Sequence, residues 1–100
     1  MIQHQSLHDL IVDMHALDRE LQRFEEKYSI LSLDFYQLYA AGRLRDEEVE
    51  EIDEFGRWAA LFQMRKRREQ QYQTEKAKLF NAQQPSEPIM FIPYATSKVM

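Results

Sequence analysis

Apolar residues recur at alternating intervals of three and four through the N-terminal part of the chain. This spacing is that of an a/d coiled-coil seam, and it predicts a helix over about residues 6–28. The seam consists of Leu7, Leu10, Met14, Leu17, Leu21, Phe24 and Tyr28. Ser6 is a suitable N-cap, and the Asp9 carboxylate would face the positive end of the helix dipole. We expect the seam to pack along one partner helix, either within the chain as a helical hairpin or across a dimer.

A short second helix is expected over about residues 32–41. Ser32 is placed to cap it, and Gly42 is placed to end it in the left-handed conformation, which needs no Cβ atom. Its large side chains are Phe35, Tyr36, Leu38 and Tyr39. Because these aromatic residues are too close in sequence to share one helix face, we expect a wedge between two long helices. An exposed aromatic patch for a partner is the alternative.

The next stretch lacks a strong helix breaker, and it predicts a long third helix over about residues 46–80. Asp46 is a suitable N-cap, and the acidic residues that follow suit the first turn. The expected inner stripe is Val49, Ile52, Phe55, Ala59 and Phe62. Gly56 weakens this helix only slightly, and it would let another helix approach closely.

Between Trp58 and Met64 the apolar residues are not confined to one side of the third helix. A helix that is apolar nearly all round is buried on more than one side. We therefore expect a homodimer whose interface contains Trp58, Leu61, Phe62 and Met64. An acidic block at 46–54 and a basic block at 65–68 flank Trp58, so two antiparallel copies would set opposite charges against each other. A solvated helix with charges spread for solubility is the alternative.

The chain changes character near residue 82, which divides it into a helical domain (1–82) and a tail (83–100). All three prolines lie in this tail. Residues 89–95 are apolar and rich in β-formers, so we expect them to be extended. We expect Ile89, Phe91, Ile92 and Tyr94 to bind the sheet edge or a groove of a partner. Docking of the tail on the chain's own helices remains open.

Composition excludes several classes of protein. The chain has 100 residues, which allows one domain, and no cysteine, which excludes disulfides and thiolate metal sites. Its net charge of −4 argues against a dedicated nucleic-acid coat. The N-terminus has no basic region followed by an apolar stretch, and no apolar run is long enough to span a membrane. We expect a cytoplasmic protein with no membrane contact.

Few residues point to catalysis or to a cofactor. His4 and His8 are one helical turn apart, but this spacing is common by chance, and we expect no metal site. No nucleophile–base pair or Gly-rich phosphate loop is present, so we expect no enzyme activity and no cofactor. Arg65, Lys66, Arg67 and Arg68 offer a contact to nucleic acid, although a solvated face or ion pairing is the favoured interpretation.

The segment over about residues 22–64 carries a resemblance to a known family. The matching residues are Glu26-Lys27-Tyr28, Phe35-Tyr36, Tyr39, Gly42, Leu44, Trp58-Ala59 and Leu61-Phe62. They are similar to a pattern in which a K-Y-G turn, an S-x-x-x-F helix, a G-x-L end and an acidic stretch precede a W-A-x-L helix. This pattern resembles small prokaryotic antitoxins of the TumA type, many of them encoded beside a ribonuclease-like toxin of the TumE type. Ser29 stands where the family usually has glycine, and the acidic stretch is longer than usual.

The sequence therefore predicts an all-α, dimeric protein with an extended tail and no active site. The resemblance implies that this protein binds and neutralises a cognate toxin. Two other functions remain open from the residues themselves. One is a helical structural or assembly module, and the other is a small DNA-binding regulator that uses Arg65 to Arg68.

Overall fold

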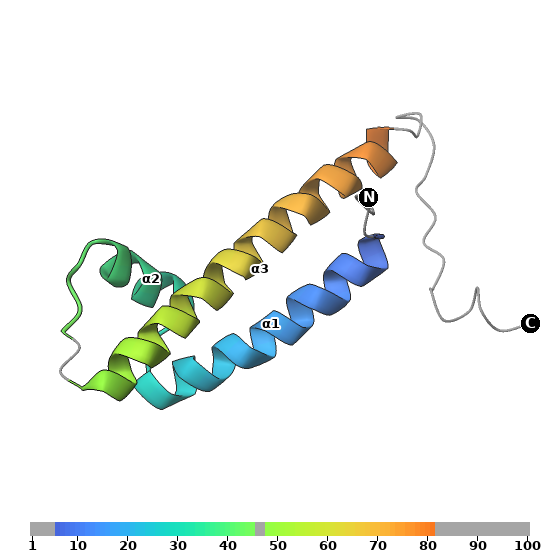
Figure 1. Cartoon of the computed structure of the whole chain (residues 1–100). Coiled ribbons are helices and arrows are strands. Elements are labelled where there is room, and N and C mark those ends of the chain that lie inside the picture. The colour runs from blue at the N-terminus through green and yellow to red at the C-terminus, as the bar shows by residue number, and fades with distance from the viewer. Residues whose placement is uncertain (1–5, 46–47, 82–100) are drawn as a thin grey trace, which may run out of the picture.

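The computed structural model describes residues 6–45 and 48–81 of the chain. In these residues it has three helices and no strand (Figure 1). The helices are α1 (Leu7–Tyr28), α2 (Ser32–Ala40) and α3 (Val49–Asn81). The long–short–long arrangement confirms the predicted fold class, whereas the expected extended tail lies outside the described residues.

Helices α1 and α3 run side by side in opposite directions, and α2 packs where α1 ends and α3 begins (Figure 1). Three ion pairs between the long helices follow this antiparallel order. They are Lys27–Glu54 at 2.6 Å, Asp18–Arg65 at 2.8 Å and Asp13–Arg68 at 3.4 Å. The seam of α1 buries Leu10, Met14 and Leu21. Within the chain, the partner of this seam is therefore α3, as the hairpin interpretation predicted.

The ends of α1 follow from two serines. The Ser6 side chain accepts a hydrogen bond of 3.1 Å from the backbone N–H of Asp9, which confirms the predicted N-cap. At the other end Ser29 has φ 57° and ψ 40°, in the left-handed region. A residue with a Cβ atom is strained there, whereas glycine is not. Ser29 therefore turns the chain from α1 toward α2 at some cost in stability.

α2 begins at Ser32, as predicted, but Ser32 is not its cap. Ser32 lies inside the helix, and the preceding Leu31 occupies the cap position without a side-chain hydrogen bond. The prediction for the end of α2 is confirmed, because Gly42 is left-handed with φ 67°. The N–H groups of Gly42 and Arg43 donate to the carbonyl groups of Tyr39 and Leu38, at 3.1 and 2.9 Å. This pair of bonds is a Schellman motif, which satisfies the free carbonyl groups at a helix end.

The core lies where the three helices meet. It consists of the buried residues Leu21, Phe35, Phe55, Trp58 and Ala59. The ring of Phe35 stacks on the ring of Trp58 with centroids 3.8 Å apart. The ring of Phe24 also stacks on Trp58, with centroids 5.5 Å apart. Phe35 therefore forms the predicted wedge, whereas Tyr39 on the same helix is exposed. Stacked rings of this kind contribute to stability beyond the area that they bury.

The inner stripe of α3 differs from the predicted one at its N-terminal end. Phe55 and Ala59 are buried as expected, but Val49 is 74% exposed and Ile52 is 50% exposed. The buried face follows Phe55, Trp58, Ala59 and Phe62, with the 3-1-3 spacing of one helix face. Four residues before Phe55 this face reaches Glu51, which is half-buried. Val49 and Ile52 precede Phe55, the first buried residue of α3, and no other part of the described chain buries them.

α3 begins at Val49, later than the predicted start at Asp46. Asp46, the expected cap, lies outside the described residues.

Candidate functional site

The residues predicted for a dimer interface are distributed between the core and the surface. Trp58 has no exposed surface, so it belongs to the core of the single chain and cannot contact a second copy in this conformation. The structure of a single chain therefore does not support its placement in an interface. Leu61 and Phe62 are half-buried and pack against the core, and Met64 is 37% exposed. Of these four residues, Met64 is the most accessible to a partner.

Both charge blocks of α3 make ion pairs within the chain. Glu54 of the acidic block pairs with Lys27, and Arg65 of the basic block pairs with Asp18. Arg68 pairs with Asp13. These contacts reduce the charge that remains for a second copy or for nucleic acid. In the predicted basic run, Lys66 and Arg67 are the exposed members.

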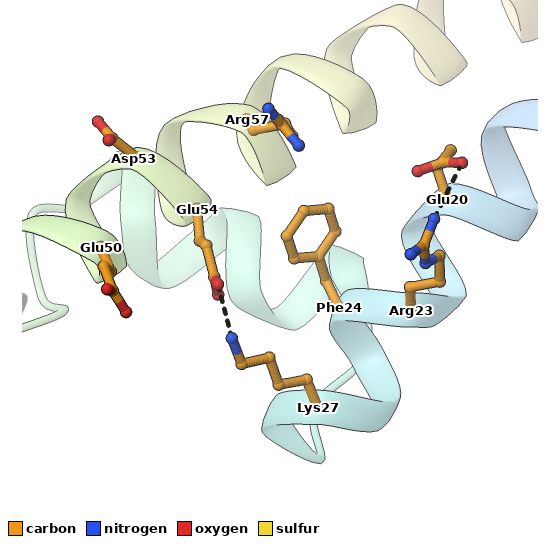
Figure 2. Close-up of a pocket in the computed structure, with 8 residues that line it drawn as sticks. All are labelled: Glu20, Arg23, Phe24, Lys27, Glu50, Asp53, Glu54 and Arg57. Atoms are coloured by element: carbon orange, nitrogen blue, oxygen red, sulfur yellow. Dashed lines mark hydrogen bonds and ion pairs between the residues drawn. The ribbon is translucent and has the colours of Figure 1, made fainter.

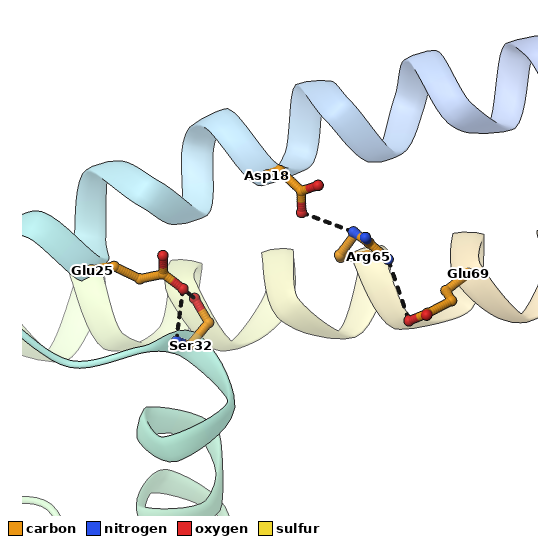
Figure 3. Close-up of polar contacts among 5 residues, drawn as sticks. All are labelled: Asp18, Glu25, Ser32, Arg65 and Glu69. Carbon is orange, nitrogen blue, oxygen red and sulfur yellow. Dashed lines mark hydrogen bonds and ion pairs between the residues drawn. The ribbon is translucent and has the colours of Figure 1, made fainter.

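A hydrogen-bond relay links the three helices at their meeting point. The indole N–H of Trp58 donates to the hydroxyl of Ser32 at 2.9 Å, and this hydroxyl donates to the Glu25 carboxylate at 2.7 Å. The backbone N–H of Ser32 donates to the same carboxylate at 2.8 Å (Figure 3). The sequence analysis missed this relay. The signal was the indole N–H, because a buried tryptophan needs an acceptor.

Lys27, Tyr28 and Glu54 form a second polar cluster between α1 and α3. The ammonium of Lys27 lies 2.6 Å from one carboxylate oxygen of Glu54, and the Tyr28 hydroxyl donates to the other. The bond to Lys27 lowers the pKa of Glu54, and the bond to Glu54 raises the pKa of Lys27. The pKa of Tyr28 is raised as well, first by its bond to Glu54 and then by burial.

This cluster borders a groove of about 490 Å³, which we call the polar groove. Its lining residues come from α1 and α3, and Phe24 is the one with an apolar side chain. Figure 2 shows the Lys27–Glu54 contact on one side of Phe24 and the contact between Arg23 and Glu20 on the other. Groups of both signs line it, so the groove does not select one sign of ligand charge.

A second groove, of about 430 Å³, has a mostly apolar lining, and we call it the apolar groove. Its apolar residues are Leu21, Leu31, Leu33 and Phe62. Leu31 is 64% exposed and Leu33 is 54% exposed. Figure 3 shows the charged side chains at the groove, where Arg65 lies between Asp18 and Glu69.

A third feature is a largely exposed face of α3 beside its buried face. We call it the outer stripe, and it consists of Val49, Ile52, Gly56 and Ala60. Their spacing of three, four and four places them on one side of a helix. A Cβ atom built on Gly56 would meet no other atom within 4 Å. The close helix approach predicted for Gly56 therefore does not occur within the described part of the chain.

The remaining predicted site residues lie elsewhere. His8 and His15 are exposed on α1, and His4 lies outside the described residues. Across 6–45 and 48–81, no group of three or more His, Cys, Asp or Glu side chains is arranged to hold a metal ion. The predicted partner-binding tail residues Ile89, Phe91, Ile92 and Tyr94 also lie outside the described residues.

None of the helices in the two described stretches combines the length and the apolar character required to cross a lipid bilayer. Comparison of the chain with protein-family models, with curated protein sequences and with solved structures finds no match.

Proposed function

We propose that this chain is a non-catalytic protein-binding module that neutralises a cognate toxin, as its resemblance to TumA-type antitoxins implies. The observation that supports protein binding most directly is the outer stripe of α3. Val49 and Ile52 there are 74% and 50% exposed, although both are large apolar residues. Neighbouring exposed apolar residues on one helix face are typical of a surface that binds another protein.

The charge around the outer stripe favours a basic partner. Glu50 and Asp53 are exposed in the same two turns of α3, at the side of the polar groove that α3 forms (Figure 2). The sequence segment 46–54 carries seven acidic residues. A ribonuclease must bind RNA phosphates, so the surface around its active site is expected to be basic. An acidic surface with an apolar centre is complementary to it in charge, which favours fast and oriented association.

The titratable cluster of Lys27, Tyr28 and Glu54 supports a non-catalytic role. A general acid or base works best with a pKa near the working pH. Here the pKa of Glu54 is lowered, and those of Lys27 and Tyr28 are raised, so each moves away from neutrality. The three groups satisfy one another across α1 and α3, which is a structural arrangement.

The test is co-expression with the gene encoded next to this one. The proposal expects the neighbouring gene to arrest growth alone and to be harmless together with this chain. The two purified proteins should then form a complex that weakens as the salt concentration rises, because charge contributes to the association. If the neighbouring gene is harmless alone, the toxin-neutralising proposal fails.

Two matched variants locate the binding surface. Ile52→Lys replaces an exposed apolar residue of the outer stripe and opposes a basic partner, so complex formation should fall at least tenfold. Leu79→Lys places the same charge on another exposed apolar residue, 42% exposed against 50% for Ile52, near the other end of α3, and it should leave binding unchanged. Equal binding by both variants would place the partner surface elsewhere on the chain.

A further inference from the structure

The apolar groove exposes two leucines because the residue between them is held in the core. Ser32 is buried, and Glu25 and Trp58 hold its hydroxyl and its backbone N–H. Leu31 and Leu33, on either side of Ser32, are therefore held outward, at the groove. They are the two most exposed leucines in the described residues. Covering these apolar side chains would remove them from water, which favours an occupant.

We propose that residues 89–94 of the same chain bind in the apolar groove. Residues 82–88 are long enough to bring this segment from the end of α3 back to the groove. From Asn81 at the end of α3 back to Glu69 at the groove is about 18 Å, at about 1.5 Å per helical residue. Residues 82–88 span up to about 23 Å when extended, at about 3.3 Å per residue. Ile89 can therefore reach the Glu69 end of the groove without any change in the helices.

Residues 89–94 are also long enough to extend along the groove. From Glu69 to Phe62 the helix axis advances about 10 Å, at about 1.5 Å per residue. Residues 89–94 span about 17–20 Å when extended. The segment is therefore long enough to continue past Phe62 to the leucines that begin α2.

The side chains of residues 89–94 match the apolar lining of the groove. The segment reads Ile89-Met90-Phe91-Ile92-Pro93-Tyr94, with no charged residue. An extended segment of this kind places alternate side chains in an apolar groove. The sequence thus supplies apolar residues for an apolar lining.

This inference is independent of the proposed function. The toxin-binding surface proposed above is the outer stripe, and the tail binds at a different place on the chain. The tail would then cover the apolar residues of its own fold, and would not contact the partner.

Disulfide trapping in the full chain tests the proposal cleanly, because the chain has no cysteine. In the double variant Leu33→Cys with Tyr94→Cys, the two thiols should be close enough to form a disulfide within one chain. The matched control is Val12→Cys with Tyr94→Cys. Val12 is 48% exposed and lies on α1, on a different side from Leu21. Under mild oxidation, the first pair should cross-link at least tenfold faster than the control pair, as a monomer on a non-reducing gel.

Equal rates for the two pairs would overturn the proposal. A covalent dimer from the first pair would also overturn it, because it would assign the groove to the tail of a second copy. A second measurement needs no cross-link. Phe91→Ser with Ile92→Ser should raise the fluorescence of an added apolar dye severalfold, since the groove would be vacated. Unchanged dye fluorescence would contradict the proposal, and circular dichroism checks that the helices are intact.

Discussion

The indole N–H of Trp58 on α3 donates a hydrogen bond of 2.9 Å to the hydroxyl of Ser32, which opens α2. Trp58 has no exposed surface and Ser32 is buried, so this bond is made away from water. The same hydroxyl donates to Glu25 on α1. One serine therefore connects all three helices, and the bonds that it makes fix the position of α2.

Ser32→Ala should lower the free energy of unfolding by about 1–3 kcal/mol, because it leaves the buried indole N–H without its acceptor. Urea unfolding followed by circular dichroism measures this loss. The loss should be smaller in a Trp58→Phe background, where no indole N–H remains. An equal loss in both backgrounds would mean that the Trp58–Ser32 bond contributes nothing.

Ser29→Gly should raise the free energy of unfolding by about 0.5–1 kcal/mol, because the residue has φ 57° and glycine adopts this conformation without strain. The midpoint of thermal unfolding should rise by about 3–5 °C for a domain of this size. Ser29→Ala is the matched control, since it removes the hydroxyl and keeps the Cβ atom. A gain with alanine equal to the gain with glycine would argue against strain at this position.

Glu54→Gln should flatten the acid side of the stability profile. The pKa of Glu54 is lowered in the folded protein, so its stabilising effect is present above its ordinary pKa of 4.5. It is lost as the pH falls through the lower folded value. Thermal unfolding between pH 6 and pH 2 measures the effect. Glu20→Gln changes the net charge equally and is the control. Identical acid profiles for wild type and Glu54→Gln would contradict the role given to the Lys27 and Tyr28 contacts.

The dependence of stability on pH above pH 10 tests the same cluster of Lys27, Tyr28 and Glu54. The pKa of Tyr28 is raised above its ordinary value of 10.0, so its contribution is present below that pH and lost above it. Tyr28→Phe should therefore reduce the fall in stability above pH 10. A fall as steep as in the wild type would exclude Tyr28 as a contributor.

Met64→Glu tests the predicted homodimer without disturbing the core, because Met64 is 37% exposed, whereas Leu61 and Phe62 pack against the core cluster. If α3 dimerises through this face, light scattering should find a dimer at micromolar concentration. The variant should be monomeric, because it would bury an unpaired charge. Val12→Glu on α1 is the control. A wild-type monomer at this concentration would exclude the dimer.

Gly56→Ala should stabilise the free protein by about 1 kcal/mol, since alanine favours a helix over glycine and its Cβ atom meets no other atom within 4 Å. The same change should weaken binding to the proposed partner, because it adds a methyl group to the outer stripe. Urea unfolding and titration with the partner separate the two effects. Unchanged affinity would mean that the partner does not approach α3 closely at Gly56.

Local patterns along the sequence determined the helices. The seam of α1, the Ser6 cap and the left-handed Gly42 each depend on residues a few positions apart, and all three predictions are confirmed. The seam also predicted a partner helix for α1, and the structure shows that this partner is α3 of the same chain. The function implied by the resemblance stays a prediction.

Tertiary structure alone decided where the buried face of α3 begins and where Ser32 lies. Val49 and Ile52 fit an inner stripe by spacing, but the other helices bury α3 only from Phe55 onward, and the two residues before it are exposed. Ser32 fits a cap by position, but the indole of Trp58 and the carboxylate of Glu25 hold its hydroxyl in the core. Both outcomes depend on contacts between residues far apart in the chain. Periodicity within one helix does not determine such contacts, because they depend on how all three helices pack.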